Sequence, residues 1–456
     1  MSCIATLTQL AQVLGKMPLN YDPALGLQAS GITTDTRDPI AGKVFVALRG
    51  EKFDGHEFVP VAIEKGAIAA ITDHPLPLPI PQLQVADTLQ GYQKIAIWWR
   101  QQFTIPVIAV TGSVGKTTTK ELIAAVLATQ GCVLKTEANY NNEIGVPKTL
   151  LELGSHDYAV IEMGMRAKGE IAVLAALASP TIGVITNVGT AHIGRLGSLD
   201  AIARAKCELL AEMPPTSVAI LNHDNPRLIA TAKTVWHRET LTYGLEGGDL
   251  QGQVIDNNTI SVEGMQLPLP LPGRHNASNF MAALAVAKVL QIDWSCLAAG
   301  LTVNLPPGRS QRYELPNDIL ILDETYNAGL ESMLASLQML AQTQGMRHIA
   351  VLGAMKELGE RSPQFHRQVG AGARELNLDA LLILVDSPDA EAIATGAAGL
   401  EAECFSSHAA LVERLKAFVQ PGDRLLFKAS HAVGLDRVVN QFRTEFQDPI
   451  APPCIH

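Results

Sequence analysis

The sequence predicts an α/β protein of three domains, of which the central one is a doubly wound domain with a mainly parallel sheet. The chain has 456 residues, and at roughly 150 residues per domain this length is enough for about three domains. Short apolar segments alternate with helical patterns through most of the chain, which is typical of the βα units that build a parallel sheet. Apolar residues make up 47% and charged residues 18% of the composition, which indicates a globular chain and excludes disorder for most of it.

Residues 1–104 are predicted to form a small N-terminal α/β domain. Apolar residues repeat at helical spacing at the start of the chain, so we expect an amphipathic first helix there and not a signal peptide. This repeat consists of Ile4, Leu7, Leu10 and Leu14. Two β-rich runs and a helical pattern follow, at Val44–Leu48, Ala67–Ile71 and Tyr92–Gln102.

Residues 105–307 are predicted to form the central domain. Pro106–Thr111 has the length and apolar character of a buried parallel strand. A glycine-containing loop and a helical pattern from Lys116 to about Thr129 come directly after it. Strand, loop and helix in this order open a nucleotide-binding sheet. Further buried strands are expected at Tyr158–Glu162, Ile182–Asn187 and Val218–Leu221.

Residues 308–456 are predicted to form a C-terminal Rossmann-like α/β domain. Two prolines and a glycine within Asn304–Gly308 break the periodic pattern and predict a hinge before it. The strands of this domain are expected to alternate with helices. They are expected at Ile319–Leu322, His348–Leu352, Ala380–Val385 and Arg424–Phe427, and the tail Asp448–His456 is expected to be a frayed end.

The net charge and the cysteine content limit the compartments in which the protein is expected and the classes of partner that it is expected to bind. The formal net charge is −10, which gives no general attraction to nucleic acid or to an anionic lipid surface. No apolar stretch approaches the ~20 residues needed to cross a bilayer. The six cysteines contain no C-x-x-C pair, which is typical of reduced thiols and not of a disulfide framework or a zinc site. We therefore expect a cytoplasmic protein that binds neither nucleic acid nor membrane.

The segment TGSVGKTT, at residues 111–118, carries the clearest chemical signal. Between a strand and a helix, its backbone N–H groups and the helix N-terminus are suited to cradle phosphates. Lys116 would place its charge against the outer phosphates, and the Thr117 hydroxyl would ligate Mg²⁺. The usual phosphate loop has glycine where Val110 stands, so this loop is a variant. Alone it leaves kinases, GTPases, motors and ligases open.

Motifs in all three predicted domains accompany this loop, and together they resemble the Mur ligase family. The N-terminal ones are Thr33–Arg37, Val44–Gly50 and Asp54–His56; the central ones are Asn139–Pro147, Ile161–Gly164, Thr186–His192 and Gly273–Asn279; the C-terminal ones are Asp323–Ala328, Gly353–Gly359 and Lys428–His431. The chain has no N-K-x-D guanine box, which a GTPase would be expected to show.

The resemblance implies an ADP-forming, ATP-dependent amide ligase of peptidoglycan synthesis, in which the N-terminal domain at residues 1–104 binds the UDP-sugar part of the substrate. The C-terminal motifs are most similar to those of the branch that adds D-alanyl-D-alanine to a UDP-N-acetylmuramoyl tripeptide through an acyl phosphate. Two alternatives stay open: a Mur ligase of the preceding step, which adds diaminopimelate or lysine, and a P-loop nucleotide enzyme outside the family. Asp224–Arg227 spells the D-N-P-R box of the diaminopimelate-adding enzyme, but it follows a central-domain strand and is predicted to be a turn and helix start.

The resemblance also implies roles for single residues, with ATP, two Mg²⁺ ions and a monomeric enzyme. Glu162 ends a predicted strand, where ligand crevices open in parallel sheets. Lys206 is expected either to be carbamylated, which would make it an anion beside the metals, or to be an ordinary solvated helix lysine. The expected catalytic residues are Lys116, Glu162, His192 and Lys206, and the expected metal ligands are Thr117, Glu162, His192 and carbamylated Lys206. ATP contacts are expected from Thr111, Gly112, Ser113, Val114, Gly115, Lys116, Thr117, Thr118, Asn139, Asn142, Asn276, Asn279, Arg309, Asp323 and Tyr326. Substrate contacts are expected from Thr34, Asp35, Thr36, Arg37, Phe45, Asp54, His56, Asn327, Lys428 and Ser430.

Overall fold

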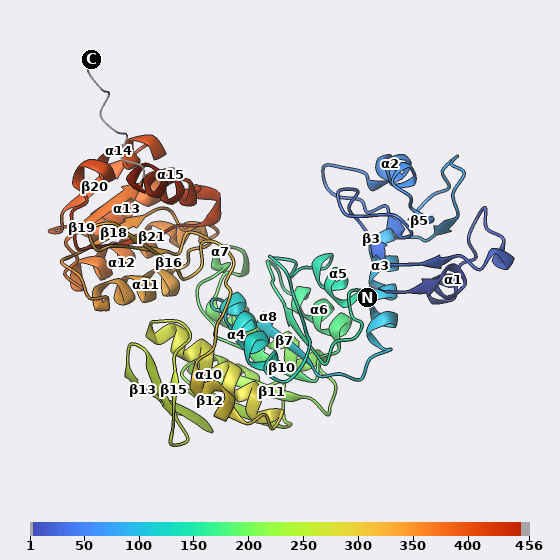
Figure 1. The fold of residues 1–456 in the computed structure, drawn as a ribbon, viewed down its shortest axis with the longest axis horizontal. Helices are drawn as coiled ribbons and strands as arrows, with labels where there is room; N and C mark the ends of the chain where they lie inside the picture. The colour runs from blue at the N-terminus through green and yellow to red at the C-terminus, as the bar shows by residue number, and fades with distance from the viewer. Residues whose placement is uncertain (1–2, 448–456) are drawn as a thin grey trace, which may run out of the picture.

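The computed structural model describes residues 3–447, which fold into three α/β domains arranged as an open arch (Figure 1). The central domain forms the middle of the arch, and the N-terminal and C-terminal domains lie at its two ends. The α/β class and the parallel sheets expected from the sequence are confirmed. The tail Asp448–His456 lies outside the described residues. Within residues 3–447, no helix combines the length and the apolar character needed to span a bilayer.

The N-terminal domain is a parallel sheet of four short strands with helices around it. Its strands are β3 (Ile32–Thr33), β4 (Val44–Val46), β5 (Ala69–Thr72) and β6 (Gln82–Gln84), paired in that order, and a separate antiparallel pair is formed by β1 (Ala5–Thr6) and β2 (Gln28–Ala29). Its helices are α1 (Leu7–Leu14), α2 (Val59–Glu64) and α3 (Thr88–Arg100).

The first helix is shorter than the apolar repeat predicts. Leu7, Leu10 and Leu14 are buried as expected, but Ile4 precedes the helix and is exposed. The reason is the capping box at Thr6, whose side chain accepts a hydrogen bond from the Gln9 backbone while the Gln9 side chain bonds back to Thr6. A cap of this kind fixes the first turn at Leu7.

Helix α3 joins the N-terminal domain to the central domain. Arg100 at its end is buried and donates to the backbone carbonyls of Ala178 and Ser179, at 2.9 and 3.3 Å. The Trp99 indole N–H donates to the Leu153 carbonyl at 3.1 Å. One buried and one half-buried side chain of α3 therefore bond to the backbone of the central domain.

The central domain is built on a nine-stranded sheet in the order β15-β14-β13-β12-β11-β10-β7-β9-β8. The seven strands from β8 to β13 in this order pair in parallel, and β13, β14 and β15 pair antiparallel as an edge ribbon. The strands are β7 (Val107–Thr111), β8 (Val133–Lys135), β9 (Tyr158–Glu162), β10 (Ile182–Ile185), β11 (Val218–Asn222), β12 (Thr240–Gly244), β13 (Leu250–Asp256), β14 (Thr259–Val262) and β15 (Met265–Pro268).

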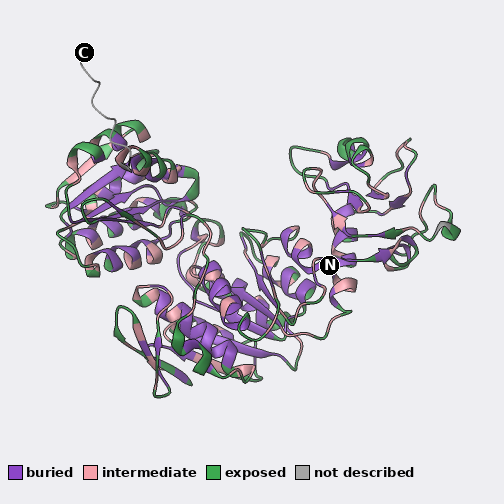
Figure 2. Cartoon of the chain, viewed as in Figure 1, coloured by how far each residue is buried: buried purple, intermediate pink, exposed green. Residues whose placement is uncertain are grey.

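Helices cover both faces of this sheet, as a doubly wound fold requires. Alternate residues of one strand belong to different cores: Val107 and Ala109 pack into one cluster, and Ile108 and Val110 into another. The second cluster contains α4 (Lys116–Leu127) and α10 (Arg274–Val289), and the first contains α5 (Gly145–Leu150), α6 (Glu170–Ala178) and α8 (Leu199–Glu212), with α7 (Ile193–Leu196) and α9 (Pro226–Ala232) nearby. Figure 2 shows the middle strands of the sheet as buried between these layers and the edge ribbon β13–β15 as partly exposed.

The C-terminal domain has a six-stranded sheet in the order β16-β17-β21-β18-β19-β20, in which only the edge strand β16 is antiparallel. The strands are β16 (Gln311–Leu315), β17 (Ile319–Asp323), β18 (Arg347–Leu352), β19 (Ala380–Leu384), β20 (Ala402–Phe405) and β21 (Asp423–Lys428). The helices are α11 (Leu330–Gln342), α12 (Ser362–Glu375), α13 (Pro388–Gly396), α14 (His408–Phe418) and α15 (Leu435–Gln447). The domain boundaries at 104/105 and 307/308 stay predictions; they fall in the segments before β7 and before β16.

The contact between the C-terminal and central domains includes an approach of two backbones. An added Cβ on Gly194 would lie 2.6 Å from the backbone nitrogen of Gly359. Gly194 N–H also donates to the Glu357 carbonyl at 3.2 Å. Only glycine on both sides permits this approach.

Candidate active site

A cavity of about 570 Å³ lies between the central and C-terminal domains. Its central-domain wall is formed at the carboxyl ends of the parallel strands, where ligands bind in doubly wound sheets. The structure brings most of the expected nucleotide and catalytic residues to this cavity. Those that line it are Ser113, Val114, Gly115, Lys116, Thr117, Thr118, Asn139, Asn142, Glu162, His192, Lys206, Asn276, Asn279, Arg309, Tyr326, Asn327 and Lys428.

The phosphate loop takes its shape from positions where a side chain cannot fit. Gly115 has φ of +81°, and a Cβ there would lie 2.5 Å from Asn279 Oδ1. A Cβ on Gly112 would lie 1.9 Å from Thr186 Oγ1. Val110, which replaces the usual glycine, is a core residue of β7, so the loop starts later than in the usual motif. Both glycines are therefore required by the fold of the loop itself.

Thr111 and Lys116 are held by the protein in different ways. The Thr111 hydroxyl donates to the Met163 carbonyl at 2.9 Å and links β7 to the end of β9. The Lys116 ammonium donates to the Gly112 carbonyl at 2.8 Å, so its side chain folds over its own loop. Burial lowers the pKa of Lys116 from its ordinary value. An anionic group in the loop would compensate this burial cost.

Glu162 is a buried carboxylate with one oxygen bonded and one not. Its Oε1 accepts from Asn141 Nδ2 at 2.8 Å, and its backbone N–H donates to Thr136 Oγ1 at 2.9 Å. Its Oε2 is buried and has no hydrogen-bond partner among the described residues. Burying a carboxylate oxygen without a partner costs free energy, and a bound cation would offset this cost. The Oε2 atom is therefore suited to be a ligand of a cation.

His192 and Lys206 face the same cavity from different helices. His192 precedes α7 with φ of +64°, and its Nδ1 lies 2.5 Å from Glu357 Oε2 of the C-terminal domain. Lys206 lies on α8 and is 1% exposed. Burial first, and then the charge of Lys116, place its pKa well below the ordinary range. The alternative of a solvated helix lysine is therefore wrong.

Asn276 and Asn279 lie side by side at the start of α10, as their spacing predicts, but their amides also serve the fold. Asn276 Nδ2 donates to the Pro272 carbonyl at 2.8 Å. Asn279 Nδ2 donates to Asn276 Oδ1 at 3.3 Å, and its Oδ1 accepts from the Thr119 hydroxyl at 3.2 Å. The polar edges that remain face the cavity next to Gly115.

The C-terminal wall of the cavity is rich in charge. The Arg309 guanidinium lies 4.0 Å from the centre of the Tyr326 ring. Lys428 donates to the Asn327 carbonyl at 3.1 Å and lies 3.8 Å from Glu324 Oε2. Burial lowers the pKa of Lys428. This wall offers cations to an anionic ligand.

Two expected C-terminal contacts do not reach the cavity in this structure. Asp323 is buried, and its Oδ1 accepts from the N–H and hydroxyl of Thr325, at 3.0 and 2.6 Å. The Ser430 hydroxyl accepts from the Lys356 N–H at 2.9 Å. Both side chains stabilise turns behind the wall, and this differs from the direct contacts that the resemblance implies.

The expected substrate residues of the N-terminal domain lie outside this cavity. The expectation that Phe45 contacts the substrate does not agree with the structure. Phe45 is 1% exposed and packs in a core cluster with Ile40 and Val59, so its ring is not accessible to a ligand. Of the others, Thr34, Asp35, Thr36 and Arg37 lie in one loop of this domain, and Asp54 and His56 lie at the start of a short 3-10 helix, η2 (Gly55–Phe58).

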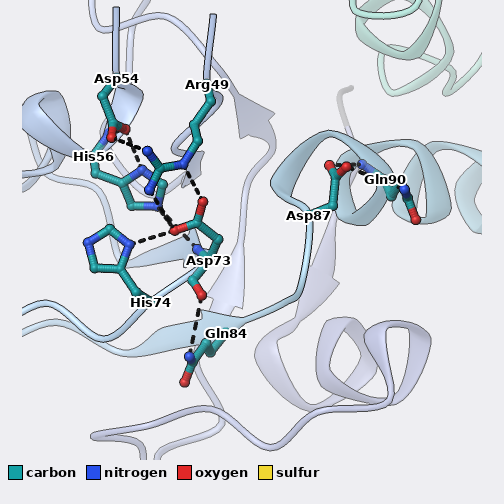
Figure 3. A network of polar contacts seen from close by, with 8 residues as sticks. All are labelled: Arg49, Asp54, His56, Asp73, His74, Gln84, Asp87 and Gln90. Carbon is teal, nitrogen blue, oxygen red and sulfur yellow. Dashed lines mark hydrogen bonds and ion pairs between the residues drawn. The ribbon is translucent and has the colours of Figure 1, made fainter.

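Asp54 and His56 belong to a closed polar network (Figure 3). His56 Nδ1 lies 2.6 Å from Asp54 Oδ1, and His56 Nε2 accepts from the Asp73 N–H at 3.1 Å. Nε2 also lies 3.2 Å from Asp73 Oδ1, so the His56 ring is held between two carboxylates. Arg49 pairs with both Asp54 and Asp73. A Cβ on Gly55 would lie 2.5 Å from the Leu48 carbonyl oxygen, so no side chain fits at this position. The D-G-H motif therefore stabilises the local fold of the N-terminal domain.

The same network holds the one group of three potential metal ligands found among the described residues: His56, Asp73 and His74. Arg49 occupies the Asp73 carboxylate with a bond of 2.5 Å, and it holds the pKa of that carboxyl well below its usual range. A metal ion there would meet a guanidinium and a His56 lone pair already used by the backbone. These residues do not fit a metal site.

Sequence reasoning missed several residues of the cavity. Asn141, which bonds Glu162, lies between Asn139 and Asn142, the two asparagines that were expected to contact ATP. Its position in this polar run was the signal by which the sequence could have indicated it. His275, Glu324 and Glu331 also line the cavity, and Glu357 bonds His192. No pattern along the chain indicates which side chains of one domain face another.

The fold and the site are those of a nucleotide-binding α/β enzyme whose phosphate loop lines a cavity shared with the third domain. Three family descriptions match the chain in order: the Mur ligase catalytic domain at residues 28–93, the Mur ligase middle domain at 110–287 and the Mur ligase glutamate ligase domain at 308–431. The chain belongs to the Mur ligase family, a family of ATP-dependent ligases.

Within this family, the relatives with high identity carry one name. The UDP-N-acetylmuramoyl-tripeptide–D-alanyl-D-alanine ligase of Synechocystis is 57% identical, over 97% of this chain and 96% of that protein. The enzyme of this name from Escherichia coli is 37% identical, over 95% and 97%. A crystal structure of MurF from Acinetobacter baumannii matches with a TM-score of 0.88 and 32% identity, over 97% and 99% of the two chains. MurF ligase from Thermotoga maritima in complex with ADP matches with a TM-score of 0.82 and 31% identity, over 92% and 98%.

Proposed function

We propose that this chain joins D-alanyl-D-alanine to the peptide carboxylate of a UDP-N-acetylmuramoyl tripeptide, with hydrolysis of ATP to ADP and phosphate. The full-length identity to ligases of this name supports the proposal. The observation that carries it is the cavity, in which the phosphate loop and Glu162 of the central domain face Arg309 and Lys428 of the C-terminal domain. A ligase must hold ATP, a carboxylate and an amine together, and a cavity between two domains provides this arrangement.

The first chemical step is phosphoryl transfer. A carboxylate oxygen of the tripeptide attacks the γ-phosphorus of ATP, the bond to the β-phosphate oxygen breaks, and ADP leaves. Phosphoryl transfer needs positioning and charge neutralisation more than covalent help. Lys116 and the N–H groups from Ser113 to Thr117 would hold the phosphates, once the ligand releases Lys116 from the Gly112 carbonyl.

The site fits the magnesium that this chemistry requires. The unpartnered Oε2 of Glu162 is a hard oxygen ligand already fixed in place, because Asn141 holds the other oxygen. The Thr117 hydroxyl and His192 line the same cavity and complete the proposed ligands. Mg²⁺ held there would neutralise charge that develops on the phosphates.

Lys206 is proposed to be carbamylated. A charged ammonium is unfavourable in its position, because it is buried, has Lys116 nearby, and forms no ion pair with a described carboxylate. The lowered pKa favours the neutral amine, whose nitrogen attacks CO₂ and loses a proton to give a carbamate. This anion would add an oxygen ligand beside His192.

The second step forms the amide. The amine of D-alanyl-D-alanine attacks the acyl carbon, the bond to the phosphate oxygen breaks, and phosphate leaves with the amine proton passing to solvent or product. The proposed role of Asn327 and Lys428 is to hold the incoming dipeptide, for whose carboxylate the Lys428 ammonium is suited. Closure of the C-terminal domain would exclude water from the acyl phosphate.

The remaining parts of the proposal concern the binding of the UDP moiety, the oligomeric state and the cellular compartment. The loop at residues 34–37 of the N-terminal domain would bind the UDP moiety, at a distance from the reacting carboxylate. We also expect a monomeric, cytoplasmic enzyme.

One experiment tests the proposed reaction. Phosphate release from Mg-ATP is measured with UDP-N-acetylmuramoyl tripeptide, with and without D-alanyl-D-alanine, and the product mass is determined in parallel. Release that depends on the dipeptide, with a product heavier by one D-alanyl-D-alanine unit, is the expected result. Release that instead requires a single amino acid and the UDP-muramoyl dipeptide would move the assignment one step earlier. A Lys116→Met variant is the inactive control.

A further inference from the structure

We infer that Glu331 is a positioning residue that transmits the docking of the C-terminal domain to the phosphate loop through Thr190. This inference rests on the proposed function for its kinetic consequence but not for its structural one. Glu331 lies in the first turn of α11, at the edge of the cavity. It is not among the residues that sequence reasoning assigned to the site.

The first link in this path crosses the domain boundary. Glu331 Oε1 accepts from the Thr190 backbone N–H at 2.8 Å, and Oε2 accepts from the Thr190 hydroxyl at 2.9 Å. Both oxygens of one carboxylate therefore bind one residue of the other domain. Thr190 is 6% exposed, and charge-assisted bonds in such a position are stronger than neutral ones.

The second link connects this loop to the phosphate loop. The Ser113 hydroxyl donates to the Gly189 carbonyl at 3.1 Å and accepts from the Gly189 N–H at 2.9 Å. The Val114 N–H donates to Asn187 Oδ1 at 3.0 Å. Residues 187–190, here called the bridging loop, thus hold the backbone that cradles phosphates.

The third observation is the close fit at Gly189. A Cβ there would lie 2.8 Å from the Glu331 carboxyl carbon, so the carboxylate packs directly on the bridging loop backbone. A rigid contact of this kind moves as a unit with α11. When the C-terminal domain undocks, the bridging loop loses its two bonds to Glu331, while its bonds to Ser113 and Val114 remain as the only ones described that hold it to the phosphate loop.

The consequence for catalysis follows from the need for precise positioning. Phosphate-loop N–H groups stabilise the transferring phosphoryl group only in the correct geometry. Docking that also brings the C-terminal wall into place would therefore complete the phosphate site at the same moment. Glu331 acts through Thr190 and Ser113, and no contact with substrate is required of it.

The kinetic test uses Glu331→Gln, Thr190→Val and the double variant. Each single variant is expected to lower kcat about tenfold, since small misplacements of reacting groups have large effects, and to leave KM for the UDP-linked substrate unchanged. The double variant is expected to be no slower than the slower single variant, because both break one path. Thr190→Ser, which keeps the hydroxyl, retains activity, and Glu375→Gln, on the exposed end of α12, controls for loss of one surface charge. Losses that add in the double variant would overturn the inference.

A second measurement does not need ligase activity. Hydrogen exchange followed by mass spectrometry is expected to show faster exchange in residues 111–118 and 187–192 of Glu331→Gln, at an unchanged thermal midpoint, and no change in Glu375→Gln. Protection in residues 111–118 that is identical to the wild type would overturn the inference. If the wild type fails to ligate D-alanyl-D-alanine, the proposed function falls, and the exchange result still decides the role of Glu331.

Discussion

Asn141 binds Oε1 of Glu162 at 2.8 Å and leaves Oε2 buried without a partner among the described residues. One amide thus fixes the orientation of a carboxylate and leaves its second oxygen without a hydrogen-bond partner among the described residues. A ligand set is most effective when neighbouring groups hold it in place before the ion arrives.

Replacing Asn141 tests this arrangement. Asn141→Ala is expected to raise the Mg²⁺ concentration for half-maximal activity by about tenfold, in line with the effect of second-layer partners in metal sites. The measurement is a magnesium titration of phosphate release at saturating ATP. A magnesium requirement equal to that of the wild type would contradict the role assigned to Asn141, and Asn258→Ala, in the turn before β14, is a matched control.

Gly115→Ala is expected to abolish detectable ADP binding while the protein still folds. An added methyl group would lie 2.5 Å from Asn279 Oδ1, and φ of +81° is unfavourable for alanine. Isothermal titration with Mg-ADP measures the affinity, and thermal unfolding reports the fold. Gly169→Ala offers a control, since that glycine also has positive φ but nothing within 4 Å of an added Cβ; binding by Gly115→Ala at wild-type affinity would be inconsistent with the geometry of the loop.

Lys206→Ala is expected to lose nearly all activity and to regain part of it with added formate or acetate. A small carboxylate can enter the space left by the side chain and replace the proposed carbamate. Activity is measured with and without the carboxylate, with chloride at equal ionic strength as the control. Full activity without any addition would exclude the carbamate.

The Arg49–Asp73 pair gives a pH-dependent contribution to stability. Arg49 holds the folded pKa of Asp73 below that of an unfolded aspartate, which is near 3.9. The carboxylate therefore stabilises the fold above about pH 4, and this contribution is lost as pH falls toward the folded pKa. Asp73→Asn is expected to lower the thermal midpoint at pH 7, and the difference from the wild type is expected to shrink between pH 4 and pH 2. A difference that stays constant across this range would contradict the assignment.

Phe45 distinguishes a core residue from a ligand contact. Phe45→Ala is expected to destabilise the protein by about 3 to 5 kcal/mol, because a buried ring is removed. Phe45→Leu, which keeps most of the volume, is expected to retain the wild-type KM for the UDP-linked substrate. Urea unfolding and steady-state kinetics measure the two effects. An increase in KM for Phe45→Leu without loss of stability would restore the substrate-binding interpretation.

The fully buried parallel strands, such as β9, were predictable because burial on both faces leaves an uninterrupted apolar run. The parallel strands β8, β12 and β20 are only partly buried and were not predicted. Tyr158–Glu162 was predicted with its observed bounds, and Glu162 lies at the strand end as expected. The edge ribbon β13–β15 was missed, since its residues alternate between buried and exposed and interrupt any such run. The D-N-P-R box was correctly predicted as a turn and helix start, and Asn225 caps α9 there.

The residues of the site were predictable where a short motif is enough to determine the local backbone conformation. The phosphate loop is such a case, because Gly115 and Lys116 belong to one segment of eight residues and line one cavity. Phe45 and Asp323 illustrate the opposite case: a motif contains residues that bind and residues that support the fold, and only packing separates them. Contacts such as Thr190–Glu331 join residues 141 positions apart, which local patterns do not encode.

The two joints of the arch differ in what must be broken to move them. At α3, Arg100 and Trp99 insert side chains into the central domain, so rotation there would expose a buried guanidinium. At the C-terminal joint, the backbones of Gly194 and Gly359 meet, and separation would break the bonds of Glu357 with Gly194 and His192 and those of Glu331 with Thr190. These polar contacts can be exchanged for contacts with water, so we expect the C-terminal domain to move more readily than the N-terminal domain, which would stay at a fixed distance from the phosphate loop.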